Sequence, residues 1–447
     1  MTSETFDLII KGGRVATPGG LVEADVGVRD GRIVALGSLS GMRAAETVDA
    51  ARLHVLPGVI DTQVHFREPG LEHKEDLATG TASAILGGVT TVFEMPNTKP
   101  LTLRAPELND KLARAKGRAS SDYAFFIGAA AENADELGAL ERLPGCCGVK
   151  MFMGSSTGSL LVPDDPTVRR VLKSGTRRVA VHAEDEPRLL ERKNIAESAG
   201  RPHAHPEWRD VESALRATTR LLSIAREVGR RVHVLHVTTA EEMALLAHNK
   251  DVATVEVTPQ HLTLAAPECY DRLGNFAQMN PPIRETRHRD ALWKAIEEGV
   301  VDVLGSDHAP HTRAEKEQPY PKSPSGMPGV QTLLLLMLDH VNKGRLSLER
   351  LVDLTAHGPQ RIYNIACKGR IALGYDADFV LVDMKARRRI TVAAMASKTG
   401  WTPFDGMETT GWPTATILRG RMVMKDGERM GPPSGAPVRF LETLDAR

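Results

Sequence analysis

The sequence predicts an α/β protein with two parts: a (β/α)₈ TIM barrel, and a small β-sandwich built from both ends of the chain. Three observations predict this fold. Eight short apolar, β-branched runs recur between residues 56 and 310, helix-like segments fill most of the gaps, and both flanks share a glycine-punctuated alternating pattern. Strands that alternate with helices form parallel sheets, and eight such units over roughly 250 residues match a barrel.

The strands and helices of the expected barrel follow from hydrophobic patterning. The apolar runs are short and rich in valine and isoleucine, which is typical of strands in a parallel sheet. They occupy residues 56–65, 88–96, 123–129, 148–153, 178–184, 231–238, 253–259 and 301–310. Helical segments are expected in the gaps, at residues 105–117, 134–143, 211–229, 240–249 and 289–299.

The flanks of this repeating region have the alternating apolar and polar pattern that is typical of an antiparallel sheet. Short alternating runs with glycine turns lie at residues 6–48, 369–384 and 414–427. Neither flank alone is long enough for a sheet with its own core, so we expect them to form one β-sandwich together. The expected boundaries are residues 1–54 plus 368–447 for the sandwich, and residues 55–367 for the barrel with the active site.

Composition and charge argue against several functions. The 447 residues include 57 Lys+Arg and 57 Asp+Glu, so no net charge attracts the chain to nucleic acid or an anionic membrane. The longest apolar run, residues 333–338, is too short to cross a membrane, and the N-terminus lacks the layout of a signal peptide. Four cysteines, two of them adjacent, do not suggest a disulfide framework. We therefore expect a cytoplasmic protein with reduced cysteines.

Polar side chains stand where the expected barrel strands end. His65, His182 and His236 end the first, fifth and sixth runs, and Asp307 lies near the end of the eighth. Any one of them alone is more often an ordinary polar residue. The C-terminal ends of barrel strands converge on one site, and three histidines with an aspartate suit Zn²⁺ or a similar divalent ion. Together they predict a metal site.

Lys150 lies within the apolar fourth run, GVKMFM. A buried lysine without a partner is costly, so its amine needs an explanation. A salt bridge or a side chain that reaches the surface is one interpretation. The other is an amine that CO₂ has converted to a carbamate, which bridges two metal ions.

Arg67 and Asn97 follow the first two runs and are candidates for substrate binding. A buried guanidinium suits bidentate recognition of a carboxylate. The alternative for Arg67 is a surface ion pair with Glu68 or Glu72, and the alternative for Asn97 is a turn residue.

Asp307 and His311 lie in the string SDHAPH, which closes the eighth run. An aspartate beside a metal site is well placed to act as general base and then as general acid. His311 lies four residues further on and is expected either to reach the substrate or to pack within its loop.

Longer strings carry a resemblance to a known family. They are PGVIDTQVHFREPG, HKEDLATGTASAILGGVTTV, MPNTKP, GVKMFM, VHAED, LHVTTAEE, EVTPQHL, NPPIR, GSDHAPHT, SGMPGVQT and GRIALGYDADFVLVD, and they extend from residue 57 to residue 383. In these strings the chain resembles the amidohydrolase superfamily and, within it, the class I dihydroorotase family. REPG together with MPNT points to that family, because hydantoinases lack this arginine and allantoinases usually carry asparagine there.

The resemblance implies a reaction and a set of roles. The reaction is reversible hydrolysis of the cyclic amide of dihydroorotate to N-carbamoyl-aspartate, in de novo pyrimidine synthesis, with one or two Zn²⁺ ions per chain. Relatives of this kind are commonly homo-oligomers, and aspartate transcarbamoylase is a further expected partner. Asp307 would also be the catalytic acid and base. The implied metal ligands are His65, Lys150 (carbamylated), His182, His236 and Asp307, and the implied substrate-binding residues are Arg67, Asn97, Asn280 and His311.

Three glutamines depart from the family pattern. Gln63 stands where the family has its first metal-binding histidine, Gln260 replaces the first of two adjacent histidines, and Gln331 replaces a glutamate. An amide is a weaker ligand than imidazole, so we expect Gln63 to be a weak or lost ligand of the more buried metal position. Glu94 is a candidate to compensate for it.

These departures keep two alternatives open. One is a non-catalytic relative that serves as a structural partner of aspartate transcarbamoylase, which the three glutamines favour. The other is another cyclic amidase, of the hydantoinase or allantoinase type. Arg67 opposes the second alternative, because a substrate without a carboxylate has no use for it. Retention of five chemically important residues argues against the non-catalytic alternative. They are Lys150, His182, His236, Asp307 and Arg67.

Overall fold

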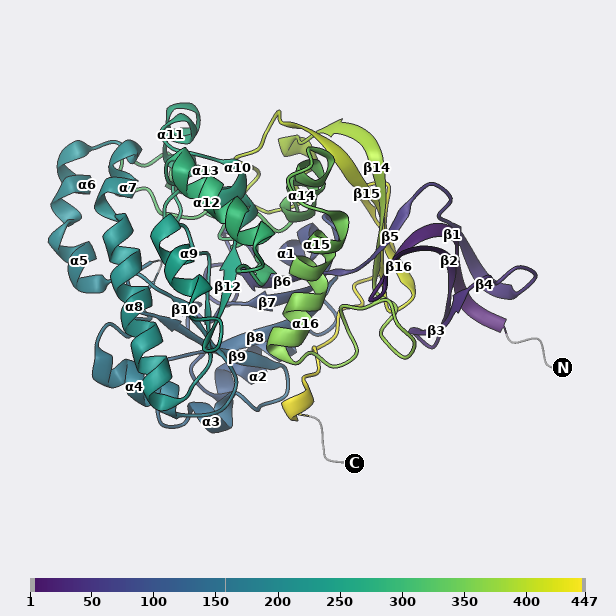
Figure 1. Cartoon of the computed structure of the whole chain (residues 1–447), viewed down its shortest axis with the longest axis horizontal. Helices are drawn as coiled ribbons and strands as arrows, with labels where there is room; N and C mark the ends of the chain where they lie inside the picture. The colour runs from purple at the N-terminus through teal and green to yellow at the C-terminus, as the bar shows by residue number, and fades with distance from the viewer. Residues whose placement is uncertain (1–4, 157, 444–447) are drawn as a thin grey trace.

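The larger part of the structure is a barrel of eight parallel strands surrounded by helices (Figure 1). The computed structural model describes residues 5–156 and 158–443. Neighbouring strands pair in chain order, and a bridge between Val64 and His308 closes the barrel. Every predicted run overlaps a barrel strand, which confirms the predicted fold class. The strands are β6 (Val59–Val64), β7 (Val89–Glu94), β8 (Asp122–Gly128), β9 (Cys146–Phe152), β10 (Val179–His182), β11 (Val232–Val234), β12 (Ala253–Val257) and β13 (Val303–Leu304).

Helices cover the outside of the barrel (Figure 1). They are α1 (Leu77–Leu86), α2 (Ala105–Ala115), α3 (Leu137–Leu140), α4 (Asp165–Lys173), α5 (Glu186–Glu191), α6 (Lys193–Ala199), α7 (His205–Trp208), α8 (Val211–Val228), α9 (Ala240–Ala247), α10 (Pro259–Thr263), α11 (Glu268–Leu273), α12 (Thr286–Glu297), α13 (Arg313–Lys316), α14 (Leu333–Asn342), α15 (Leu348–Val352) and α16 (Gly358–Tyr363). The five predicted helical segments correspond to α2, α3, α8, α9 and α12. Among the described residues, no helix has both the length and the apolar character needed to span a membrane.

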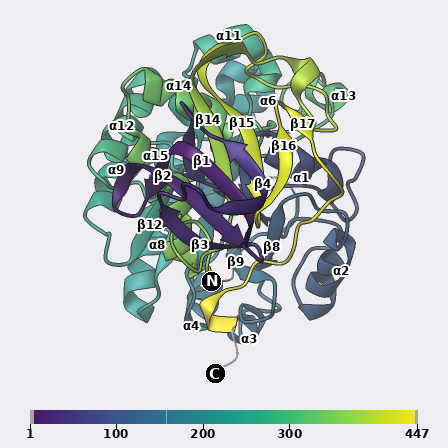
Figure 2. The ribbon, with the colours of Figure 1, turned by 90° about the vertical axis from the view of Figure 1, so that its right-hand side faces the viewer.

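The second part is a nine-stranded sheet to which both ends of the chain contribute, as predicted (Figure 2). Its N-terminal and C-terminal halves meet where β5 pairs with β14 in antiparallel register. Leu8, Val26, Phe379 and Ile417 belong to its separate apolar core. The strands are β1 (Thr5–Thr17), β2 (Gly20–Arg29), β3 (Arg32–Gly37), β4 (Arg43–Asp49), β5 (His54–Pro57), β14 (Phe379–Arg389), β15 (Glu408–Leu418), β16 (Arg421–Lys425) and β17 (Glu428–Arg429).

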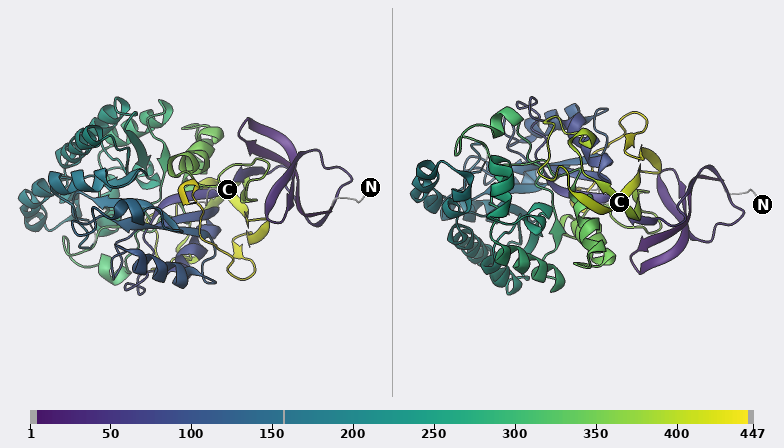
Figure 3. Two further views of the ribbon diagram at one scale, coloured as in Figure 1. Left: turned by 90° about the horizontal axis from the view of Figure 1, so that it is seen from below. Right: turned by 90° about the horizontal axis from the view of Figure 1, so that it is seen from above.

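The chain passes from this sheet into the barrel at a single residue. Gly58 alone separates β5 from β6, and its N–H donates to the carbonyl of Asp378 at 2.9 Å. A Cβ atom here would lie 2.2 Å from Thr90 Oγ1, so only glycine fits. The sheet consequently sits at one end of the long axis, beside the barrel (Figure 3). The boundaries at 54/55 and 367/368 stay a prediction.

An apolar plug fills the N-terminal half of the barrel. Side chains alternate along each strand, so one set packs outward on the helices and the other points inward. Phe93 and Phe126 belong to the inward set, and the Phe93 ring lies 5.1 Å from that of Tyr363 and 5.7 Å from that of Phe440. With this half closed, the polar residues at the opposite strand ends can form a site.

Candidate active site

Four of the predicted metal ligands form two close pairs at the C-terminal ends of the barrel strands. His65 Nε2 lies 3.2 Å from Asp307 Oδ1, and His182 Nδ1 lies 3.1 Å from His236 Nε2. All four side chains are buried. The backbone of His236 and Asp307 has φ values of 38° and 43°, in the left-handed region that non-glycine residues seldom adopt. Strain of this kind is concentrated at functional sites.

Asn97 orients His65. Its Oδ1 atom accepts a hydrogen bond from His65 Nδ1 at 2.8 Å. Burial lowers the pKa of His65, so the ring is neutral and its Nε2 atom carries a lone pair. Asn97 is therefore more than a turn residue, because it fixes which nitrogen faces Asp307.

Glu184 orients His182, a role that the sequence analysis did not predict. Glu184 Oε2 lies 2.9 Å from His182 Nε2, and Arg209 pairs with the same carboxylate. Burial alone would raise the pKa of Glu184, but the charge of Arg209 and the hydrogen bond from His182 lower it to about 2. An ionised carboxylate behind a histidine holds the ring in one tautomer. The signal was available, since VHAED places Glu184 two residues after the histidine.

Lys150 is fully buried in β9. Its Nζ atom has no hydrogen-bond partner among the described residues, and it lies 4.4 Å from the centre of the Phe152 ring. The interpretations as a salt bridge or a surface-reaching side chain are therefore wrong. Burial lowers its pKa to about 7, so a large fraction of the amine is neutral near pH 7. A neutral amine is the form that reacts as a nucleophile.

The donor atoms fit bound divalent ions. The Nδ1–H of His65 donates to Asn97, so the Nε2 atom carries a lone pair and faces the Asp307 carboxylate. Two acceptor atoms 3.2 Å apart repel each other, and a cation bound between them would remove this repulsion. Two nitrogens that each lie about 2.0–2.1 Å from one tetrahedral Zn²⁺ are about 3.3 Å apart. The 3.1 Å between His182 Nδ1 and His236 Nε2 is close to this separation. The unpartnered Lys150 amine is a further group that a ligand would satisfy.

Gln63 lies at the site, but its amide nitrogen faces the carboxylate. Nε2 donates to Asp307 Oδ1 at 3.0 Å, and Oε1 is buried without a hydrogen-bond partner among the described residues. The side chain therefore acts as a donor to Asp307. Glu94, the candidate to compensate for Gln63, pairs through Oε2 with Lys111 of α2.

The other two glutamines bind backbone groups. Gln260 Nε2 donates to the carbonyl of Ser306 at 2.6 Å. Gln331 Nε2 donates to the carbonyl of Ala394 at 2.7 Å, and its Oε1 accepts from the N–H of Ala396 at 2.9 Å. A glutamate carboxylate can accept but cannot donate, so only an amide makes both bonds. The glutamine at position 331 therefore has a structural explanation.

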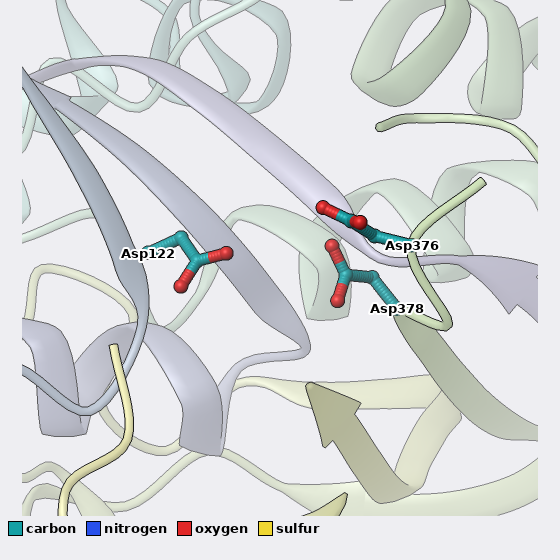
Figure 4. Close-up of side chains that lie close together, drawn as sticks. All are labelled: Asp122, Asp376 and Asp378. Atoms are coloured by element: carbon teal, nitrogen blue, oxygen red, sulfur yellow. The ribbon is translucent and has the colours of Figure 1, made fainter. Parts of the chain in front are cut away.

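A second group of acidic residues lies at the junction of barrel and sheet (Figure 4). Ligand oxygens of Asp122, Asp376 and Asp378 lie within 4.8 Å of one another, and all three residues are buried or nearly so. Lys368 already occupies the centre of the group: its Nζ lies 2.6 Å from Asp122 and 3.1 Å from Asp376, and it also pairs with Asp378. Burial opposes the charge of Lys368, but the three carboxylates hold its pKa well above its ordinary value. We therefore interpret this group as an ion-paired structural link.

Arg67 and Asn97 line a cavity of about 540 Å³, and the hydrogen bond from His65 to Asn97 connects this cavity to the His65–Asp307 pair. Arg67 is buried, and its Nε donates to the carbonyl of Pro310 at 3.2 Å. Burial lowers its pKa to about 10, which leaves it charged at neutral pH. The alternative, a surface ion pair with Glu68 or Glu72, is wrong, because Arg67 is buried. Glu68 pairs with Arg118 at 2.7 Å, and Glu72 lies 3.8 Å from Arg114.

His311 and Asn280 lie in one hydrogen-bond network near this cavity. His311 Nε2 lies 3.3 Å from Arg67 Nη2 and 3.0 Å from the carbonyl of Ser325. Asn280 Oδ1 lies 2.9 Å from His205 Nε2, which is 3.4 Å from the hydroxyl of Ser325. The structure thus brings all the predicted substrate-binding residues near the cavity or into networks that reach it.

The fold and these residues define a class: (β/α)₈ barrels with a buried polar site at the C-terminal ends of the strands. Comparison with known proteins agrees. The model of the amidohydrolase family matches residues 163–423, and the dihydro-orotase-like model matches residues 52–144. The chain belongs to the amidohydrolase family and is a hydrolase, which confirms the resemblance seen in the sequence.

Individual relatives carry more specific names. The chain is similar to a dihydroorotase of Halobacterium salinarum, with 39% identity over 88% of this chain and 91% of the relative. It is also similar to a dihydroorotase of Methanothermobacter thermautotrophicus, with 35% identity over 95% of each chain. Among solved structures, an L-hydantoinase (dihydropyrimidinase) from Arthrobacter aurescens has a TM-score of 0.92 at 30% identity, over 97% of this chain and 99% of that one.

Proposed function

We propose that this chain is a dihydroorotase, which interconverts dihydroorotate and N-carbamoyl-aspartate in pyrimidine synthesis. One observation carries the proposal: the buried, charged Arg67 lines the cavity that adjoins the His65–Asp307 pair. A guanidinium at this place suits a cyclic amide that also bears a carboxylate. The two archaeal relatives named dihydroorotase support this choice.

The proposed cofactor is one or two Zn²⁺ ions per chain. His65, Lys150 (as a carbamate), His182, His236 and Asp307 would hold them. When bound, zinc supplies Lewis acidity toward the ring carbonyl and makes water easier to deprotonate.

The residues of the chain would bind the substrate and move the proton. Arg67 and Asn97 would hold the carboxylate, so that the ring amide faces Asp307 in a fixed orientation. Gln63 and His65 both contact Asp307 Oδ1, which leaves Oδ2 to take the proton of the attacking water. Asp307 would then deliver that proton to the departing ring nitrogen. Asn280 and His311 would complete the wall around the substrate.

Two further proposals concern the setting of the enzyme. The balanced charge and the four reduced cysteines support a cytoplasmic protein. A homo-oligomer, with aspartate transcarbamoylase as a second partner, is proposed from the family resemblance.

A substrate panel tests the proposed function. We expect kcat/KM for dihydroorotate to exceed that for an unsubstituted hydantoin or for allantoin about a hundredfold or more, because only dihydroorotate offers a carboxylate to Arg67. Steady-state hydrolysis of the three substrates by one zinc-loaded sample makes the comparison. Faster turnover of hydantoin or allantoin would favour the other cyclic amidases. No turnover of any of them would favour the non-catalytic partner.

Gln63→His should raise the zinc content of the purified protein by about one ion per chain, since imidazole is a better zinc ligand than an amide that donates to Asp307. Elemental analysis after dialysis at equal free zinc measures this content. Gln260→His is the matched control, because Gln260 bonds the Ser306 carbonyl and should leave the zinc content unchanged. Equal zinc in wild type and Gln63→His would show that Gln63 does not limit metal binding.

A further inference from the structure

Lys74 lies against His311 in the wall of the cavity, although 237 residues separate them in the chain. Its Nζ atom is 3.1 Å from His311 Nδ1 and 2.9 Å from Glu315 Oε1. Lys74 precedes α1, and Glu315 belongs to α13. Neither residue has a role in the mechanism described so far.

The contact with Lys74 fixes the tautomer of His311. An ammonium group has hydrogens to donate and no lone pair to accept, so His311 Nδ1 must be the acceptor. Burial and the charges of Arg67 and Lys74 hold the pKa of His311 well below its usual value, which keeps the ring neutral with a single proton. That proton must then be on Nε2, where the carbonyl of Ser325 accepts it at 3.0 Å.

This tautomer leaves part of Arg67 available. Arg67 Nη2 lies 3.3 Å from His311 Nε2, close enough for a hydrogen bond if Nε2 carried a lone pair. Because Nε2 carries the proton instead, Arg67 Nη2 cannot donate to it. The Nη2 donor therefore stays free for an acceptor in the cavity.

Glu315 would favour the opposite tautomer if Lys74 were absent. Its Oε2 atom lies 4.0 Å from His311 Nδ1 and is the carboxylate nearest to that nitrogen among the described contacts. Without the lysine, a proton on Nδ1 would be attracted to this carboxylate. Nε2 would then give up its bond to the Ser325 carbonyl and accept from Arg67 instead, which would draw the guanidinium away from the cavity.

We propose that Lys74 is a positioning residue: it holds His311 as the Nε2–H tautomer and so keeps Arg67 free to bind the carboxylate of the substrate. This inference rests on the proposed function and names a second determinant of selectivity for carboxylate-bearing cyclic amides. It predicts that losing Lys74 weakens binding of the anionic substrate more than it slows the chemical step.

Spectra of the histidine rings test the tautomer without any substrate. Long-range ¹H–¹⁵N correlations of zinc-loaded, ¹⁵N-histidine-labelled protein show which ring nitrogen carries the proton, and His311→Gln assigns the signal. We expect Nε2–H in the wild type and Nδ1–H in Lys74→Met. Lys74→Arg should restore Nε2–H, because arginine also only donates. Lys74→Met combined with Glu315→Gln should restore it too, because the carboxylate that attracts the proton is gone.

Kinetics test the consequence for Arg67. We expect Lys74→Met to raise KM for dihydroorotate about tenfold while kcat changes less than about threefold, and both rescue variants to reverse the rise. Lys398→Met is the matched control: Lys398 pairs with Asp76 at 2.6 Å and does not line the cavity. Persistence of Nε2–H in Lys74→Met, or an unchanged KM, would overturn the proposal. Failure of the proposed function would instead appear as absent turnover in the wild type, with the tautomer shift in the spectra unaffected.

Discussion

Asp307→Asn should lower kcat for dihydroorotate hydrolysis about a thousandfold, because an amide cannot take the proton of the attacking water. Asparagine has nearly the same shape as aspartate and keeps one oxygen to accept the bond from Gln63 Nε2. The fold should therefore survive the change. Stopped assays with saturating substrate and excess zinc measure kcat, and elemental analysis of the same sample shows how much metal remains.

The control for this change lies five residues earlier in the chain. Asp302 pairs with Lys250 and accepts from the N–H of Val255 at 2.8 Å. It precedes β13, at the opposite end of the strand from Asp307. Asp302→Asn keeps an acceptor for Val255 and should keep nearly full activity. If Asp307→Asn retained more than a tenth of wild-type kcat at full zinc occupancy, another group would have to move the proton.

Arg67→Met should lower kcat/KM for dihydroorotate by about 10²- to 10³-fold, because loss of one partner from a desolvated charge pair is costly. Turnover of a neutral ring such as hydantoin should fall by less than about threefold, because that ring offers nothing to the guanidinium. Side-by-side kcat/KM values for the two substrates measure this difference. This single substitution should thus remove most of the preference for dihydroorotate over a neutral ring.

Arg114→Met is the matched control for Arg67→Met. Arg114 lies on α2 with its side chain 39% exposed, and it pairs with Asp110 at 2.6 Å and with Glu68 at 3.6 Å. It does not line the cavity, so its loss changes the net charge equally and leaves the cavity wall intact. It should leave both rates near the wild-type values. Equal losses on both substrates in Arg67→Met would mean that Arg67 supports the structure of the site and does not select the carboxylate.

The three glutamines weigh less against catalysis once their contacts are known. Gln260 and Gln331 bond backbone groups of neighbouring segments and do not contact the side chains of the proposed metal ligands in any described hydrogen bond. Of the three glutamines, Gln63 contacts Asp307, the proposed general base. One weakened metal position is compatible with hydrolysis, because a single ion can both polarise the ring carbonyl and make water easier to deprotonate.

The barrel and the location of its site follow from local sequence patterns. Short β-branched runs alternate with amphipathic segments, and each such pattern spans few enough residues to be read directly. Polar residues at the ends of these runs, such as His182 and Asp307, predict a site because parallel barrel strands end on one face. The sheet built from both ends of the chain was predicted in the same way, from a shared texture and from the shortness of each flank.

Which atoms meet within the site depends on tertiary structure. The hydrogen bond from Gln63 to Asp307 spans 244 residues, and the contact of Lys74 with His311 spans 237. No local pattern shows that Gln63 presents its nitrogen to Asp307 or that Lys368 fills the acidic group at the junction. Sequence alone therefore determined the barrel and the types of residue at its rim. Tertiary structure decided their protonation and partners, because burial and hydrogen bonding arise only when distant segments pack together.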